Sequence, residues 1–246
     1  MRPVFSFTFF TVLSGAGYGL LALLGLVGNA HGKASTMAFG LTAITMAMVL
    51  ITTGLVASTA HLGGPQQAWR SSWVSRSRIA AVITYPTALA YGCAWSGLVD
   101  ASVLIAPLGI LTALMCGFTA FCAGMIYHSR KASPAWHSKI AVTAYLAFAL
   151  ASGSGLLNAI SFVFGRFQTD AGKFMALLTV ALTLIAIAFK WFDRSNHDKK
   201  LQIIMFALLA MAVVLTLLSL ILPWLTFIVA LLVLGAAWTE RWHFFA

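Results

Sequence analysis

Long apolar runs, interrupted by short polar segments, constrain this sequence more than any other feature. Hydrophobic residues make up 61% of the chain and charged residues 8%, far from the balance of a soluble domain. A helix needs about 20 apolar residues to cross a bilayer, and we predict spans at 5–28, 37–60, 79–99, 103–127, 139–163, 172–190, 201–221 and 224–239. We therefore expect an all-α membrane protein with eight transmembrane helices, forming a single domain over residues 1–246.

Two boundaries need their own arguments. Residues 201–239 are nearly unbroken, and one helix of that length would measure roughly 58 Å, about twice the hydrocarbon core of a bilayer. We predict that the chain turns back at Pro223 and Trp224. The first apolar run is too long for the core of a signal peptide, so we expect it to be retained as a span.

Lysine and arginine are distributed unequally between the two predicted faces. Twelve of the fifteen lie on the side of the two termini, and only Lys33, Arg166 and Lys173 lie on the other. The positive-inside rule then places both termini and their neighbouring loops in the cytoplasm. The formal net charge of +10 is thereby explained by membrane topology, without nucleic acid as a partner.

Small residues at helical spacing occur twice, as Gly15 and Gly19 in the first span and as Ser152–Gly155 in the fifth. Such faces allow helix backbones to approach closely inside a bilayer, and close packing is the role we predict. Two alternatives stay open. The faces could form a slot for a flat ligand, and the two motifs are compatible with two four-helix halves.

The distribution of reactive side chains argues against several functions. No aspartate, glutamate, lysine or arginine falls near the middle of a predicted span, which disfavours a proton pump. Only Asn158 and the Ser152–Gly155 stretch hint at a transporter. The six histidines lie at span ends or in loops, so we expect no haem. The three cysteines show no C-x-x-C spacing, and we expect no metal site in this chain.

Polar and aromatic residues gather instead in the segments 61–76 and 127–137, which open on the same predicted side. Aromatic rings, hydrogen-bond donors and an imidazole with a pKa near neutrality suit a quinone headgroup. The candidate quinone-binding residues are His61, Trp69, Arg70, Trp73, Tyr127 and His137. Tyr127 and Trp136 also fit as interfacial anchors, and His61 fits as an interfacial residue or one that interacts with the dipole at a helix C-terminus.

The same side offers residues for docking a soluble partner. Arg70, Arg76, Arg78 and Trp136 are the candidates, because arginines attract an acidic protein surface. The loop from Lys190 to Lys200 is expected to be a solvated, topology-fixing segment. The C-terminal "WTERWHFFA" is expected to be an interfacial aromatic belt, with partner docking as the alternative.

Several of these motifs together resemble the membrane anchor subunits of the DMSO reductase family. They are "SGAGYG", "HLGGPQQAWRSSWVSR", "MIYHS", "AWHS" and "ERWHFFA". The resemblance runs nearly the whole length, and its most specific part is the loop that begins at His61. Family loops often carry charge after the proline, where this chain has Gln66 and Gln67.

The resemblance implies a haem-free, eight-helix anchor in the bacterial inner membrane. Its partners would be a molybdopterin catalytic subunit and an iron–sulfur subunit, and electrons would pass between them and ubiquinone or menaquinone, with His61 at the quinone. The "RSSWVSR" version is similar to the membrane subunit of cytoplasmic sulfite dehydrogenase complexes, which reduce quinone. The alternatives are an anchor that oxidises menaquinol, and a purely structural anchor whose quinone is bound mostly by the iron–sulfur subunit.

Overall fold

Helices make up almost all of the described structure. The computed structural model describes residues 3–28, 36–59, 72–96, 102–130, 139–192 and 199–245. Within these ranges the chain forms eight long α-helices and the short 3-10 helix η2 (Ser102–Leu104), with no strand. The long helices are α1 (Pro3–Val27), α2 (Thr36–Thr59), α4 (Ser72–Ser96), α5 (Ile105–Arg130), α6 (Lys139–Val163), α7 (Asp170–Phe192), α8 (Lys199–Ser219) and α9 (Leu225–Phe245). The prediction of an all-α fold is confirmed.

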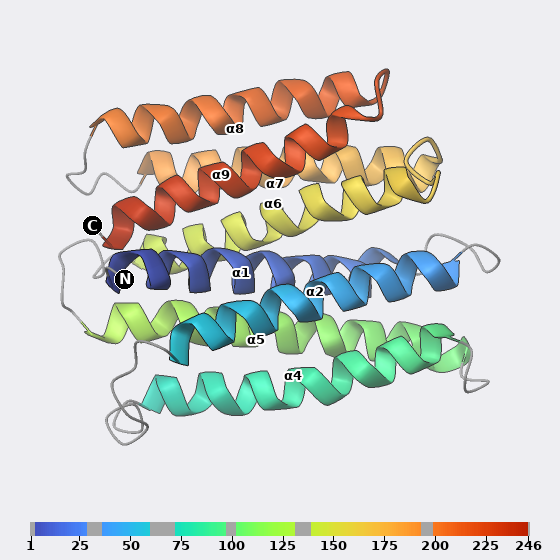
Figure 1. Ribbon diagram of the computed structural model, residues 1–246, viewed down its shortest axis with the longest axis horizontal. Coiled ribbons are helices and arrows are strands. Elements are labelled where there is room, and N and C mark those ends of the chain that lie inside the picture. Colours follow the sequence, from blue (N-terminus) through green and yellow to red (C-terminus); the bar gives the residue numbers. More distant parts are fainter. Residues whose placement is uncertain are drawn as a thin grey trace.

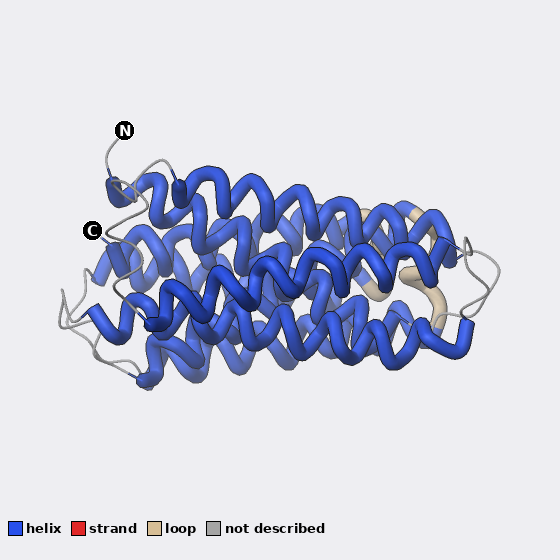
Figure 2. Tube along the Cα trace, turned by 90° about the horizontal axis from the view of Figure 1, so that it is seen from below, coloured by secondary structure: helices blue, strands red, loops and turns tan. Residues whose placement is uncertain are grey.

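The helices form one elongated bundle in which successive helices run in opposite directions (Figure 1). Pro3 and Phe245 consequently lie at the same end, called the terminal end below. Seen from below, the helices lie roughly along one axis (Figure 2). The centre is taken by α1, which contacts α2, α5, α6 and α9, and by α6, which also contacts α7.

Seven of the eight helices are long and apolar enough to cross a membrane, and α4 is not among them. The reason is composition, because threonine, tyrosine and Pro86 dilute the apolar residues of α4. This helix begins at Ser72, before the predicted span start at 79, since its polar first turns are helical as well. Likewise α9 continues to Phe245, beyond the predicted end at 239.

Glycines set the distance between the two central helices. A Cβ atom at Gly153 of α6 would overlap the backbone of Gly19 and Leu20 in α1, and one at Gly19 would overlap the Ala149 carbonyl. The same face continues at Gly15, where a Cβ would lie 3.3 Å from the Tyr145 ring. The predicted close-packing role of both small-residue motifs is confirmed.

The turn between the last two helices lies where the sequence predicts it. Pro223 sits between the end of α8 at Ser219 and the start of α9 at Leu225, and its carbonyl accepts a hydrogen bond from Thr226 Oγ1 at 2.9 Å. Proline has no amide hydrogen and cannot continue a helical ladder. The 201–239 run therefore folds back as two antiparallel helices.

Candidate functional site

Most of the predicted quinone residues lie outside the described part of the chain. His61, Trp69 and Arg70 fall within 60–71, and Trp136 and His137 within 131–138. Tyr127 belongs to α5, but its side chain is not described. The helix ends that border these two segments, from α2, α4, α5 and α6, all lie at the terminal end (Figure 1).

Trp73 is the one predicted quinone residue whose side chain is described. Its ring packs edge-on against Phe121 of α5, with centroids 6.1 Å apart, and the Arg76 guanidinium lies 4.8 Å from its ring centroid. Such cation–π contacts are worth roughly 0.5–1 kcal/mol where they are exposed. Trp73 therefore fixes the first turn of α4 against α5 and directs Arg76 outward at the terminal end.

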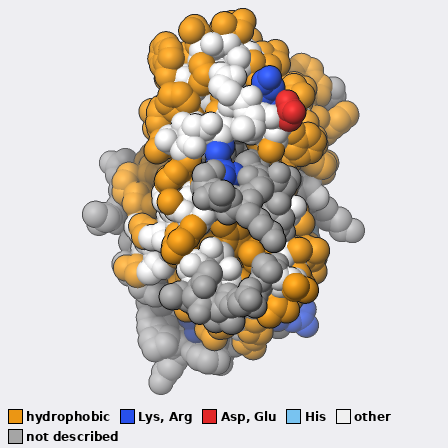
Figure 3. All heavy atoms as spheres, turned by 90° about the vertical axis from the view of Figure 1, so that its right-hand side faces the viewer, with side chains coloured by type: hydrophobic (Ala, Val, Ile, Leu, Met, Phe, Trp, Pro, Cys, Tyr) orange, Lys and Arg blue, Asp and Glu red, His pale blue; other side chains and the backbone are white. Residues whose placement is uncertain are grey.

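Basic residues on described helices also concentrate at the terminal end. Arg76 is exposed, Arg78 is half-buried, and the first turn of α8 presents Lys199 and Lys200 to the surface. The opposite end shows few charged side chains among the residues drawn in colour (Figure 3). There the buried Arg166 guanidinium lies 5.4 Å from the Phe39 ring centroid. Burial lowers the pKa of Arg166, but a guanidinium stays charged throughout the physiological range.

A buried ionic cluster, formed by Lys190 of α7 with Glu240 and Arg241 of α9, lies inside the terminal end. Glu240 Oε1 is 3.6 Å from Lys190 Nζ, and Glu240 Oε2 is 2.7 Å from Arg241 Nε. The three side chains are 2%, 1% and 4% exposed, in the order given. Formally the cluster holds two positive charges and one negative charge. Ionisable groups this deep inside a membrane protein are costly and commonly functional.

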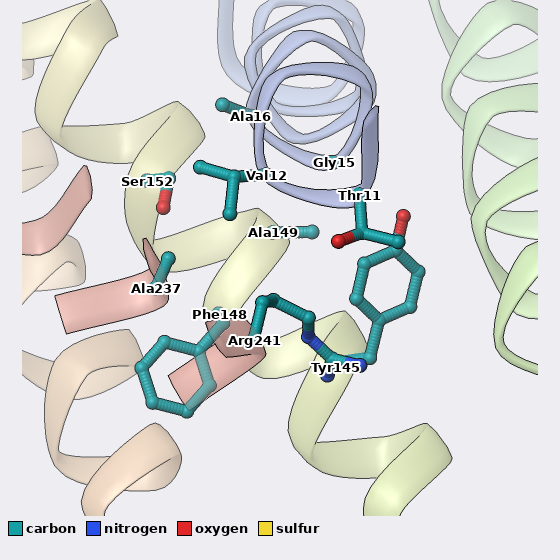
Figure 4. Close-up of a pocket in the computed structure, with 10 residues that line it drawn as sticks. All are labelled: Thr11, Val12, Gly15, Ala16, Tyr145, Phe148, Ala149, Ser152, Ala237 and Arg241. Atoms are coloured by element: carbon teal, nitrogen blue, oxygen red, sulfur yellow. The ribbon is translucent and has the colours of Figure 1, made fainter. Parts of the chain in front are cut away.

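Arg241 connects the ionic cluster to the two central helices. It reaches from α9 towards Tyr145 of α6, beside Thr11 of α1 (Figure 4), and its guanidinium is 4.7 Å from the Tyr145 ring centroid. The cavity beside them measures about 10 Å³, which is space for on the order of one water molecule. Ser152 is buried in the wall of this cavity, and its hydroxyl has no hydrogen-bond partner in the described part of the chain. As it stands, the cavity is too small for a quinone ring.

Sequence reasoning missed this cluster for two reasons. It assigned Lys190 to a solvated loop, which is wrong, because Lys190 belongs to α7 and is buried. It also ended the last span at 239 and treated Glu240 and Arg241 as part of an interfacial belt, whereas both are buried. Ala236 and Ala237, four residues earlier, lie on the same face of α9, but only the structure shows that this face is buried.

No group of three or more histidine, cysteine, aspartate or glutamate side chains is arranged to hold a metal ion within the described residues. Cys116 and Cys122 are buried and Cys93 is exposed, and all three are free thiols. Cys116 and Cys122 therefore pack as small apolar side chains inside the bundle, whereas Cys93 lies on its surface.

Comparison with known proteins agrees with the resemblance seen in the motifs. Residues 2–245 match the family described as DMSO reductase anchor subunit (DmsC). A sulfite dehydrogenase subunit of Allochromatium vinosum is 31% identical over 212 residues, a match that covers 76% of this chain and 63% of that protein, less than two thirds of its length. No solved structure matches the chain. Because the family match covers nearly every residue, this multi-pass membrane protein belongs to the DMSO reductase anchor subunit family.

Proposed function

We propose that this chain is the quinone-reactive anchor of a three-subunit molybdenum oxidoreductase. The observation that carries the proposal is the family match over residues 2–245, together with the two polar, aromatic segments that begin and end at one end of the bundle. The candidate headgroup site comprises His61, Trp69, Arg70, Trp73, Tyr127 and His137. In this site His61 exchanges the proton that accompanies each electron, and the aromatic rings hold the headgroup.

The partners we propose are an iron–sulfur subunit that docks on the terminal end and a molybdopterin subunit beyond it. Arg76 supports this surface, because Trp73 holds its exposed guanidinium at the rim. Arg70, Arg78 and Trp136 complete the proposed docking set. Electrons pass directly between the quinone and the nearest cluster of the partner, so this chain needs no metal or haem of its own.

Sulfite oxidation with quinone reduction is the reaction we propose for the complex. It is supported by the relative from Allochromatium vinosum, which is named as part of a sulfite dehydrogenase. Menaquinol oxidation by a reductase-type complex is the alternative, because the anchor contacts only the quinone.

We further propose that all eight long helices cross the bacterial inner membrane, with the terminal end in the cytoplasm. α4 has 25 residues and lies along α5, and a helix of that length measures roughly 38 Å. The contacts also support two four-helix halves. In α1, α2, α4 and α5 each helix contacts the next and the first contacts the last, and the same ring recurs in α6, α7, α8 and α9.

The test is purification of the tagged complex in mild detergent from cells carrying wild type, His61→Ala or His31→Ala. We expect molybdenum and iron to co-purify in all three cases. Sulfite-dependent quinone reduction should fall at least about a hundredfold in His61→Ala only, the lower end of what a general acid–base usually contributes. His31 lies on the opposite predicted side and serves as the control. Normal quinone reduction by His61→Ala would remove His61 from the site, and purification without metals would refute the function.

A further inference from the structure

An open groove of about 450 Å³ runs along the outer face of α2, beside α4. Six residues of α2 between Ile44 and Thr53, together with Leu89 of α4, form its walls. The groove exists because α4 packs mainly along α5 and touches α2 more sparsely. Its volume falls within the range of sites that hold small organic ligands, and it faces the lipid.

A pair of hydroxyl groups joins the two helices at this groove. Thr52 Oγ1 of α2 and Tyr85 Oη of α4 are 2.8 Å apart and share a hydrogen bond. Thr52 is exposed to the lipid side and also donates to the Met48 carbonyl at 2.7 Å. Thr45 and Thr53 also line the groove, and Thr53 donates to the Val49 carbonyl of its own helix at 2.7 Å. The Thr52–Tyr85 pair differs because it links two helices.

The groove leads towards the proposed headgroup site. Thr53 lies six residues, or about 9 Å, before the end of α2 at Thr59, and Ile44 lies about 22 Å before it. Segment 60–71, which contains His61, Trp69 and Arg70, connects the two helices that form the groove. A ligand whose tail lies between α2 and α4 would therefore extend towards the ends of these helices at Thr59 and Ser72.

We propose that the isoprenoid tail of the quinone lies in the α2–α4 groove and that the headgroup moves along this groove towards the terminal end. This inference rests on the proposed quinone-reactive function. The depth of the hydroxyl pair favours quinone over phospholipid. Thr52 lies about 10 Å along the helix from Thr59, where a phospholipid presents only acyl chain. Because Thr52 donates to the Met48 carbonyl, Tyr85 donates to Thr52, and Tyr85 Oη keeps acceptor capacity. A quinol carries its hydroxyl groups through the hydrocarbon layer and can donate a hydrogen bond there.

The experiment fills the groove and compares quinones with and without a tail. Val49→Trp places an indole in the groove, and Val214→Trp on the lipid-facing side of α8 is the control, because the two valines are similarly exposed (58% and 52%). The intact complex is assayed with a decyl-tailed ubiquinone and with a tail-less ubiquinone. We expect Val49→Trp to raise KM for the tailed quinone by about fivefold or more, as expected when one or two methylene groups lose their contacts. KM for the tail-less quinone should be unchanged, and Val214→Trp should change neither value.

The groove assignment would be overturned if the ratio of KM for the tailed quinone to KM for the tail-less quinone were the same in Val49→Trp and wild type. That result would leave the quinone function intact. Absence of quinone-linked turnover in wild type with either substrate would instead refute the function itself. If Val49→Trp does not assemble, a quinone with a photoreactive group in its tail is applied to the wild-type complex. Labelling of the Ile44–Thr53 peptide that excess decyl-ubiquinone suppresses supports the groove. Labelling elsewhere, or labelling suppressed only by phospholipid, overturns it.

Discussion

Removing the negative charge of the ionic cluster should destabilise the anchor substantially. Glu240→Gln keeps the shape of the side chain but leaves Lys190 and Arg241 without the carboxylate that separates them. All three side chains are almost completely buried, so water cannot replace the lost partner. The substitution therefore tests whether the cluster is a charge-balanced unit that joins α7 to α9.

The size of the effect follows from the distances. Two unit charges 3.6 Å apart attract by roughly 5 kcal/mol at an effective dielectric constant of about 20, and burial of the charges offsets part of this attraction. Breaking a buried ion pair by removing one partner costs about 3–5 kcal/mol. For a chain of this length, each kcal/mol lowers Tm by about 2–4 °C, so we expect a decrease of roughly 6–20 °C.

The measurement is thermal unfolding of the detergent-purified protein, followed by tryptophan fluorescence, with Lys173→Gln as the control. Lys173 is exposed at the start of α7, and its loss should shift Tm by no more than about 2 °C. Lys190→Met should lower Tm less in the Glu240→Gln background than in wild type, since the Glu240 carboxylate is already absent there. A Tm for Glu240→Gln within the range of the Lys173→Gln control would refute the buried-charge argument.

Three further predictions follow from described contacts. Gly153→Leu should prevent folding of the subunit, because the leucine side chain would overlap the α1 backbone. Gly117→Leu should be tolerated, because nothing lies within 4 Å of a Cβ atom at that site. Fluorescence-detected size exclusion in detergent distinguishes the two variants. Asn158→Leu removes the 2.8 Å hydrogen bond to Thr179 and should cost only about 0.6–2 kcal/mol, measured as a small decrease in Tm. Arg76→Gln should leave the anchor folded but release the soluble subunits at a lower salt concentration than wild type, because salt screens the attraction between exposed arginines and an acidic partner. The measurement is the amount of soluble subunits retained on the tagged anchor across a salt series.

The sequence could predict the helices because their signal is local. Twenty apolar residues between polar interruptions specify a span without reference to any other part of the chain, and Pro223 marks its own turn. The sequence could also predict that α1 and α6 each pack closely against another helix, since small residues at helical spacing indicate close packing. The partners of these faces were not predictable, because Gly19 meets Gly153 only once the bundle is assembled.

The ionic cluster could not be predicted for a related reason. Lys190 and Glu240 are fifty positions apart, and each lies near a helix end, where charged residues are normally solvated. Only tertiary packing of α7 and α9 reveals that both face the interior. The candidate quinone site presents the opposite case. Its residues are conspicuous in the sequence, and His61, the residue with the clearest proposed role, lies outside the described residues.

The proposed two halves suggest why the quinone path would be on one side of the bundle. α1 and α6 both begin at the terminal end (Figure 1), so the halves run in the same direction, and segment 60–71 of the first corresponds to segment 193–198 of the second. The first connection has twelve residues, including His61 and Trp69, whereas the second has six, with Asp193 and Arg194 among them. The second also contains a histidine, His197, but no tryptophan, so only the first combines indole and imidazole side chains. The first also joins the two helices that flank the groove. In the second half, the buried Lys190 beside the connection pairs with Glu240. In this proposal the first half provides the quinone path, whereas the second holds α9 against the central helix α6 through the contact of Arg241 with the Tyr145 ring.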